Sequence, residues 1–310
     1  ATMRPAAISF AGPAKKEGDL TRAIAAGIVI NIESHSELEA IARIGTSLAI
    51  RPSISVRVNP DFELKSSGMK MGGGAKQFGI DADQVPQLLH RVDALGLNFQ
   101  GFQIYSGSQS LKATSIMEAQ SNTFELAFRL AKNTRQATRM LNIGGGFGIP
   151  YFPGDTPIDL QLIGMHLKQW IPRIKAELPD AKIVIELGRY LVGEAGIYVT
   201  RIIDRKISRG QVFLITDGGM NHQLAASGNL GQVIRKNYPV AVGNKMHGQT
   251  REVVSVVGPL CTPLDIMADT LEMAYAEVGD LIVVFQSGAY AYTASPIGFL
   301  SHPLPDEVLV

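Results

Sequence analysis

Three consecutive glycines, Gly144, Gly145 and Gly146, follow directly after a short apolar run at 140–143. Glycine has no side chain, so backbone amides in such a run can approach an anion closely, and a phosphate is the obvious guest. Before any context is added, a tight turn that binds nothing is the simpler interpretation. The dinucleotide-binding fingerprint fits poorly, because Ile149 stands where its third glycine should be.

Two further apolar runs are also followed by residues that suit an anion or a heterocycle. Glu186 ends one run and Arg189 follows it. The arginine offers a phosphate its fork of donors, and the glutamate could hold a proton on a ring nitrogen. Ser108 follows the run at 99–104 and could donate to phosphate oxygens. A local Glu–Arg surface pair and an ordinary Ser-Gly loop are the alternatives.

The second half of the chain adds three segments with candidate side chains. They are 217–222 (DGGMNH), 258–265 with the single cysteine Cys261, and 287–290 ending in Tyr290. Taken alone, each has a bland interpretation: Cys261 as a small buried hydrophobe, His222 as a structural histidine, and Tyr290 as a core residue.

The apolar patterns that would position these residues alternate between strand and helix as far as residue 190. Strands are expected at 7–10, 28–32, 54–58, 99–104, 140–143 and 182–186, and helices at 19–26, 36–44, 83–95, 114–132 and 159–178. The helix at 36–44 is expected to have a serine cap and to stop at Gly45. Such alternation indicates parallel βαβ units, whose reactive groups collect past the carboxyl ends of the strands.

Six strands are too many for a small open sheet and too few for an eightfold barrel. Either the sheet is open or two strands precede residue 1, and the second is favoured because the chain opens without a strand or helix start. Later strands are expected at 198–203, 211–216, 253–257, 279–285 and 307–310. Their Gly and Pro turns suggest an antiparallel β-domain that begins near residue 193.

The composition is that of a globular protein, with 45% apolar and 18% charged residues among 310. A formal net charge of +1 gives no reason to expect a nucleic-acid partner, and no apolar stretch has the length of a membrane span. A single cysteine rules out an intrachain disulfide, which fits a reducing compartment, and the cytoplasm is expected. No metal site is predicted.

In chain order, the segments GSQ, GGGFG, E-x-G-R, DGGMN, C-x-x-x-D and GAY resemble the fold-type III pyridoxal-phosphate decarboxylases of ornithine, diaminopimelate and arginine. The resemblance covers essentially the whole chain. Segments 59–65, 146–152 and 258–265 are closer still to a bacterial subgroup associated with exosortase gene clusters. That subgroup is similar to decarboxylases that act on amino acids tethered to a carrier protein.

The resemblance implies a (β/α)8 TIM-type barrel, with its first strands missing here, followed by an antiparallel β-domain. Residues 1–193 would form a partial barrel that binds pyridoxal 5'-phosphate, and residues 194–310 a β-domain that contributes to a dimer and to its active site. The implied enzyme is a lyase, a homodimer with shared active sites that removes CO2 from Cα of an amino acid, free or carrier-tethered.

The resemblance also implies a role for each candidate residue. Glu186 would pair with the pyridine nitrogen and keep it protonated, so that electrons freed at Cα can spread into the ring. Cys261, supplied by the partner subunit, would deliver a proton to Cα, and Asp265 would help to set up that subunit edge. The expected cofactor ligands, besides Glu186, are Tyr105, Ser108, Gly144, Gly145, Gly146, Arg189 and Tyr290.

The sequence departs from the family pattern at four places. The cofactor lysine and its Tyr-Ala-x-Lys-Ala-Asn context are absent, and Lys15 belongs to a later motif. Either the lysine lies upstream in the natural protein or the chain is inactive. Tyr105 replaces the usual stacking histidine, so it can stack but cannot take up a proton near neutral pH. Thr262 and the neutral residues at 222–229 replace the groups that grip the far end of free diaminopimelate.

Two other functions remain open on the sequence alone. One is an amino-acid racemase on the same barrel, although Cys261 and the triple glycine favour a decarboxylase. The other is an inactive homologue that acts as a binding or regulatory subunit, which the missing lysine makes reasonable.

Overall fold

The computed structural model describes residues 3–65, 68–230, 232 and 234–310. The chain forms two compact units. The first unit contains Ala1–Phe147 and Ile158–Leu187, and the second contains Gly148–Pro157 and Gly188–Val310. Within the described residues, no helix combines the length and the apolar character that crossing a bilayer requires.

The first unit alternates strands with helices. Its elements are η1 (Pro5–Ala7), β1 (Ser9–Phe10), α1 (Glu17–Ala26), β2 (Val29–Ile32), α2 (His35–Leu48), β3 (Ser53–Asn59), β4 (Met69–Lys70), β5 (Ile80–Asp81), α3 (Val85–Ala94), β6 (Asn98–Ile104), β7 (Gly107–Ser108), α4 (Ala113–Ala131), β8 (Met140–Gly145), α5 (Leu160–Glu177) and β9 (Lys182–Glu186).

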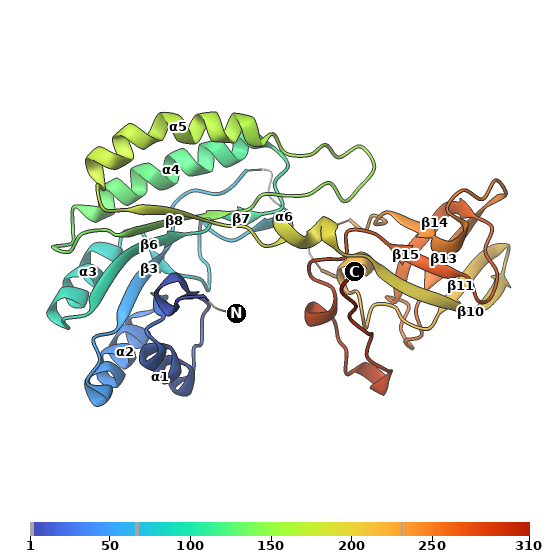
Figure 1. Cartoon of the computed structure of the whole chain (residues 1–310), viewed down its shortest axis with the longest axis horizontal. Coiled ribbons are helices and arrows are strands. Elements are labelled where there is room, and N and C mark those ends of the chain that lie inside the picture. The colour runs from blue at the N-terminus through green and yellow to red at the C-terminus, as the bar shows by residue number, and fades with distance from the viewer. Residues whose placement is uncertain (1–2, 66–67, 231, 233) are drawn as a thin grey trace. The chain divides into compact units, whose positions relative to one another are not determined.

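The main sheet of this unit is parallel throughout and has the order β1-β2-β3-β6-β8-β9, with β5 beside β3. Figure 1 shows that the sheet curls and that its helices lie along the outer side. In a parallel sheet all carboxyl strand ends meet at one edge, so the loops after β2, β3, β6, β8 and β9 gather there.

Side chains on the strands divide by type between the two faces of the sheet. Polar residues occupy alternate positions on β2, β3, β6, β8 and β9: Asn31, Ser55, Gln103, Asn142 and Glu186. The first four of these are almost fully buried. Their neighbours along the strands belong to the hydrophobic core shared with the helices: Ile30, Ile32, Ile54, Val56, Phe102, Ile104 and Leu141. Because side chains alternate along a strand, the core face is apolar and the inner face is polar.

One helix ends well beyond the expected residue. Helix α2 begins after Ser34, whose side chain accepts a hydrogen bond from the Glu37 amide, and it runs through Gly45 to Leu48. Gly45 lies inside the helix and is buried against Pro52, where an added Cβ would lie 2.6 Å from the proline ring. Close packing therefore explains this glycine, and Ala49, with φ of 53°, ends the helix in the left-handed conformation.

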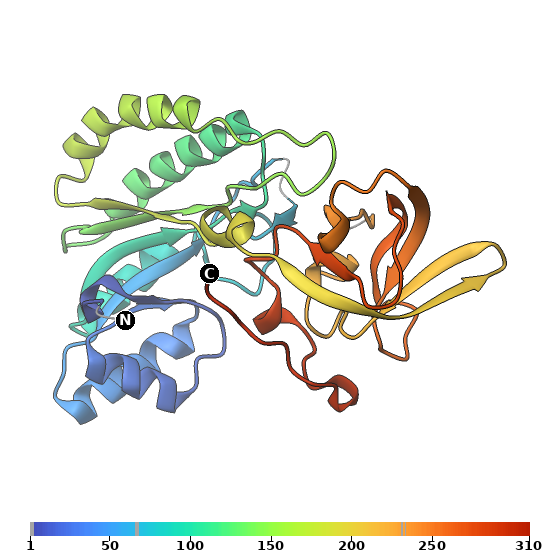
Figure 2. The same cartoon turned by 45° about the vertical axis from the view of Figure 1, so that its right-hand side comes forward.

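The second unit is a six-stranded sheet with short helical turns. Its elements are α6 (Arg189–Val192), η2 (Gly193–Ala195), β10 (Tyr198–Ser208), β11 (Gln211–Thr216), η3 (Ala225–Ser227), β12 (Val240–Val242), η4 (Gly243–Lys245), β13 (Arg251–Val257), β14 (Ile266–Ala274), β15 (Leu281–Val284), η5 (Tyr292–Ala294) and η6 (Phe299–Ser301). The strand order is β12-β15-β10-β11-β13-β14, antiparallel except for the pair β11 and β13. In Figure 2, β10 and β11 form the long yellow hairpin of this unit.

One strand expectation for this unit was wrong, and two strands were missed. The segment 307–310 is not a strand: it pairs with no other strand of the described chain, and Val308, Leu309 and Val310 are exposed. Strands β12 and β14 were not foreseen. β14 contains polar residues and shifts register against β13, which breaks the simple alternation that sequence patterns reveal.

Candidate active site

Glu186 and the triple glycine lie side by side at the carboxyl edge of the parallel sheet. Gly145 at the end of β8 is the register partner of Glu186 at the end of β9. A Cβ on Gly145 would overlap the Glu186 backbone carbonyl, so glycine permits the close approach of the two strands. The sequence expectation that these residues occupy one mouth is therefore consistent with the geometry of the first unit.

The glycine loop also packs closely on the loop that follows β6. Gly144 and Gly146 have φ of 69° and 82°, the left-handed region that favours glycine. A Cβ on Gly146 would overlap the carbonyl of Gly107, and the Gly146 carbonyl accepts a hydrogen bond of 2.9 Å from the Ser110 amide. The Gly144 amide already donates to Asn142 Oδ1 at 2.9 Å. An anion at this loop would therefore meet amides other than that of Gly144.

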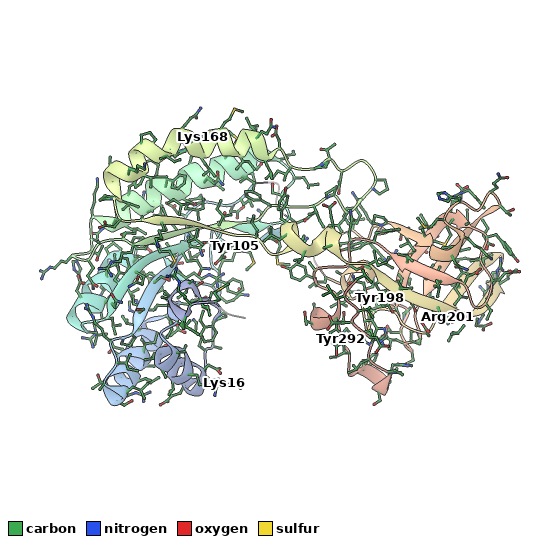
Figure 3. All side chains as sticks on the ribbon, viewed as in Figure 1. Lys16, Tyr105, Lys168, Tyr198, Arg201 and Tyr292 are labelled. Carbon is green, nitrogen blue, oxygen red and sulfur yellow. The ribbon has the colours of Figure 1, made fainter. Side chains whose placement is uncertain are left out.

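Tyr105 and Ser108 belong to the same edge. A Cβ on Gly144 would lie 3.0 Å from Cδ2 of the Tyr105 ring, so the ring packs against this glycine. Ser108 lies on β7, which pairs with β4 through Met69. Figure 3 places Tyr105 at the end of the sheet to which the parallel strands run. The first unit thus brings together Tyr105, Ser108, the three glycines and Glu186.

Two buried amide side chains hold the Glu186 carboxylate. Gln103 Nε2 on β6 and Asn142 Nδ2 on β8 each donate to Glu186 Oε1 at 2.7 Å. No hydrogen bond to Glu186 Oε2 occurs within the described part of the chain. The protein therefore fixes the Glu186 carboxylate through one of its two oxygens.

Sequence reasoning assigned no role to Gln103 or Asn142. Both stand within apolar strands, and their neighbours Phe102, Ile104 and Leu141 dominate the pattern. The sequence signal that could have revealed them is an asparagine or glutamine one to three residues before a strand end, at a position whose side chain points to the inner face of the sheet. Since an unpaired buried amide is costly, such a residue points to a polar partner on the inner face.

A buried ionic cluster occupies the other side of the same edge. Lys15 Nζ donates to the carbonyls of Gly12 and Asn31 at 2.7 and 2.9 Å and to Glu37 Oε1 at 2.8 Å. Arg57 Nη1 donates to Glu33 Oε1 at 2.9 Å. All three hydrogens of the Lys15 ammonium group have acceptors, so this lysine is a structural ion-pair residue rather than a free amine.

The second unit holds Arg189 and Tyr290 in contact with each other. The Arg189 guanidinium carbon lies 4.7 Å from the centre of the Tyr290 ring and 5.4 Å from that of Tyr151. Burial raises the pKa of the Tyr151 hydroxyl, and the nearby Arg189 charge partly opposes this shift. The planar guanidinium thus contacts two aromatic rings, which limits its rotation.

Cys261 is exposed on the loop between β13 and β14, and Asp265 holds this loop in shape. The Asp265 carboxylate is 2% exposed and accepts hydrogen bonds from the amides of Leu260 (2.9 Å) and Met220 (2.6 Å). It therefore ties the Cys261 loop to the 217–222 loop, and its contacts within this unit are structural.

His222 is fully engaged in the same unit. Its Nε2 lies 2.8 Å from the Pro303 carbonyl and its Nδ1 lies 3.0 Å from the Tyr198 hydroxyl. A carbonyl only accepts, so Nε2 donates its hydrogen to Pro303. This geometry supports the structural interpretation of His222. Among the residues that the structure describes, no group of three or more His, Cys, Asp or Glu could hold a metal ion.

Comparison with known proteins places these features in context. Residues 1–193 match the pyridoxal binding domain of the pyridoxal-dependent decarboxylases. The chain is 36% identical over 308 residues to an L-glutamyl-BtrI acyl-carrier protein decarboxylase from Niallia circulans, a match that covers 97% of this chain and 72% of that protein. It is 30% identical over 313 residues to a diaminopimelate decarboxylase from Aquifex aeolicus, covering 100% of this chain and 71% of the relative.

A solved structure supports the fold assignment. A point mutant of the diaminopimelate decarboxylase of Helicobacter pylori, in complex with L-lysine, superimposes with a TM-score of 0.83 at 25% identity, over 97% of this chain and 73% of that one. The expected fold class, a barrel-type α/β region followed by a β-domain, is confirmed.

Replacement of Gly145 tests the strand-end packing. Gly145→Ala is expected to destabilise the protein by about 2 kcal/mol or more, because its Cβ would force β8 away from Glu186. Gly164→Ala is the control: Gly164 lies in α5 with no atom within 4 Å of an added Cβ, so a gain of up to about 1 kcal/mol is expected. Chemical denaturation measures both, and equal effects would contradict the packing argument.

Replacement of Asp265 tests the loop argument. Asp265→Asn is expected to lower the free energy of unfolding by about 1–3 kcal/mol, because the amide group of asparagine offers one acceptor where two amides need one each. It should also change the rate at which Cys261 reacts with a thiol reagent. Asp306→Asn, at an exposed position, serves as the control. An unchanged stability would show that Asp265 does not hold the loop.

Proposed function

The chain belongs to the pyridoxal-dependent decarboxylases, and from this membership we propose that the full-length protein removes CO2 from the α-carbon of an amino acid held on a carrier protein. The observation that carries the proposal is the pairing of Glu186 with the glycine loop at adjacent strand ends. One oxygen of that carboxylate is held by Gln103 and Asn142, and the other would accept from a ligand.

The residues at this edge fit pyridoxal phosphate at both ends of the molecule. The cofactor, when bound, supplies a protonated ring into which electrons freed at Cα can spread. Glu186 would accept the ring N–H through Oε2, which keeps the proton on the nitrogen. The loop at 144–146 has no side chains to obstruct a phosphate, and Ser108 would add a hydroxyl donor from the neighbouring loop. Tyr105 would stack on the ring.

Arg189 and Tyr290 are also proposed as phosphate ligands, as the resemblance to the family implies. A guanidinium presents paired donors to phosphate oxygens, and its contact with Tyr151 and Tyr290 orders it before the ligand arrives. No lysine of this chain is assigned to carry the cofactor, since Lys15 is committed to its ionic cluster. The proposal is that the remainder of the full-length protein supplies that lysine.

Cys261 would act in the active site of the partner subunit in a homodimer. Its thiol is exposed on a loop that Asp265 holds rigid, so it is accessible to a second chain. There it would deliver a proton to Cα after CO2 leaves. Each site would then need two chains related by twofold symmetry. The role requires a reduced thiol, which the cytoplasm would maintain.

A carrier-tethered substrate suits the residues of the second unit better than free diaminopimelate does. Thr262 and the segment 222–229 offer no charge to a distal amine or carboxylate. Arg235 is a cationic residue further along the chain that could bind a carboxylate. Its guanidinium instead donates to the carbonyls of Ser227 and Ile266 and to Asn237 Oδ1. The Tyr238 ring stacks on Tyr151 at 4.6 Å. Three of the five N–H groups of Arg235 are therefore engaged by neutral groups of the same unit, and Tyr238 packs on an aromatic ring.

A product assay tests this function directly. The full-length protein is incubated with pyridoxal phosphate and either a glutamyl group loaded on a carrier protein or free diaminopimelate, and released CO2 is measured. Carrier-bound substrate is expected to be turned over at least about tenfold faster, a difference of about 1.4 kcal/mol in transition-state binding. Faster turnover of free diaminopimelate would overturn the substrate assignment. Racemised substrate without CO2 would overturn the decarboxylase assignment.

Two single variants separate proton delivery from cofactor binding. Cys261→Ala is expected to lose CO2-releasing turnover while it keeps the cofactor, and Arg189→Ala is expected to weaken cofactor retention by about tenfold or more. Absorbance after dialysis measures retention. Full turnover by Cys261→Ala would remove its proposed role, and unchanged retention in Arg189→Ala would remove that of the arginine.

Mixed dimers test whether the sites are shared. If Cys261 serves the partner's cofactor, mixing inactive Cys261→Ala with inactive Glu186→Gln restores one intact site per heterodimer. About a quarter of wild-type activity is then expected after random exchange of subunits. No recovery, with subunit exchange verified by mass spectrometry, would contradict a site built from two chains.

A further inference from the structure

A continuous row of hydrogen-bonded side chains runs across five strands and ends at Glu186. Ser55 Oγ donates to Asn31 Oδ1, and Asn31 Nδ2 donates to Gln103 Oε1 at 2.6 Å. Gln103 Nε2 then donates to Glu186 Oε1 at 2.7 Å. Asn142 reaches the same oxygen from the other side.

The row has one direction, which follows from the chemistry of its last member. An ionised carboxylate only accepts, so Gln103 must present its NH2 group to Glu186. The amide oxygen of Gln103 then faces Asn31 and needs a donor, which fixes the Asn31 amide in turn. Asn31 Oδ1 needs a donor as well, and the hydroxyl of Ser55 supplies it. The orientation of each side chain is therefore fixed by the next group in the row toward Glu186.

Burial makes this direction costly to reverse. Asn31 and Ser55 are 0% exposed and Gln103 is 3% exposed, so none of them can turn to water instead. In such a buried network each hydrogen bond polarises the next, and one reversed amide leaves unsatisfied atoms on both sides. Ser55 is the register partner of Asn31 and lies between β2 and β6, where its small side chain lets Asn31 and Gln103 meet across β3.

We infer that Gln103 is a positioning residue for the proposed reaction. Asn31 orients the Gln103 amide, and Gln103 in turn holds Glu186 as an acceptor whose Oε2 is directed at the cofactor ring nitrogen. This inference rests on the proposed function. Gln103 touches neither substrate nor cofactor in this role. Its amide stabilises the negative charge on Glu186 and fixes the rotation of the carboxylate, so the ring nitrogen keeps its proton.

Three variants of the full-length protein test the row. Gln103→Met removes one donor from Glu186 at similar volume. Asn31→Asp changes no residue that contacts Glu186. Its carboxylate can no longer donate to Gln103, however, so the Gln103 amide is expected to turn and present its oxygen to Glu186. Gln120→Met is the matched control, because Gln120 is a buried glutamine on α4 outside the row.

The readout is the nitrogen-15 resonance of bound pyridoxal phosphate labelled at the ring nitrogen, which distinguishes a protonated from an unprotonated ring. Wild type and Gln120→Met are expected to agree. In Gln103→Met and Asn31→Asp the pKa of the ring nitrogen is expected to fall by about one unit, which is a tenfold loss of proton affinity. The reason is that a carboxylate with less hydrogen-bond stabilisation draws the proton toward itself. Cofactor affinity should fall by about the same factor.

An identical resonance in wild type, Gln103→Met and Asn31→Asp, with the cofactor bound in each, would overturn the inference. If Gln103→Met does not fold, as judged by its circular dichroism, Gln103→Asn replaces it, since the shorter amide cannot reach both Asn31 and Glu186. A wild-type protein that binds no cofactor, or binds it without releasing CO2, would instead contradict the proposed function.

Discussion

The structure of the candidate site depends on one carboxylate that is held at one oxygen and left open at the other. Glu186 Oε1 accepts two amide N–H groups, from Gln103 and Asn142, at the edge where parallel strands end. A carboxylate without these partners would rotate freely and would have two equivalent oxygens to offer. The two amides prevent this rotation and so fix the position of the remaining oxygen, Oε2.

The parallel sheet provides this arrangement because side chains alternate along each strand. The residues that face the helices are apolar and supply the core, while those on the inner face are free to be polar. Adjacent strands then bring Asn31, Ser55, Gln103, Asn142 and Glu186 into one row. The glycines at the end of β8 let the backbone of that strand lie against Glu186. The stability of the fold and the geometry of the site are therefore set by alternate residues of the same strands.

The sequence predicted the longer strands and the helices of the first unit, because each is a run of one pattern bounded by polar or glycine residues. It missed the two-residue strands β4, β5 and β7, which are too short to show a pattern. It also predicted that Glu186 and the triple glycine share an edge, since parallel strands end together. It did not predict the holding amides, because Gln103 and Asn142 are single polar residues within apolar runs and their partners lie far along the chain. It also missed β14, whose register shift hides the alternation, and misread Gly45, whose need for space arises from Pro52.

The most direct test of the central claim is a crystal structure of the full-length protein with pyridoxal phosphate. We expect Glu186 Oε2 within about 2.7–3.2 Å of the ring nitrogen, Oε1 still bound by Gln103 and Asn142, and the phosphate at the loop of Gly144 to Gly146. A ring nitrogen that faces another residue, or a phosphate bound away from that loop, would contradict the account.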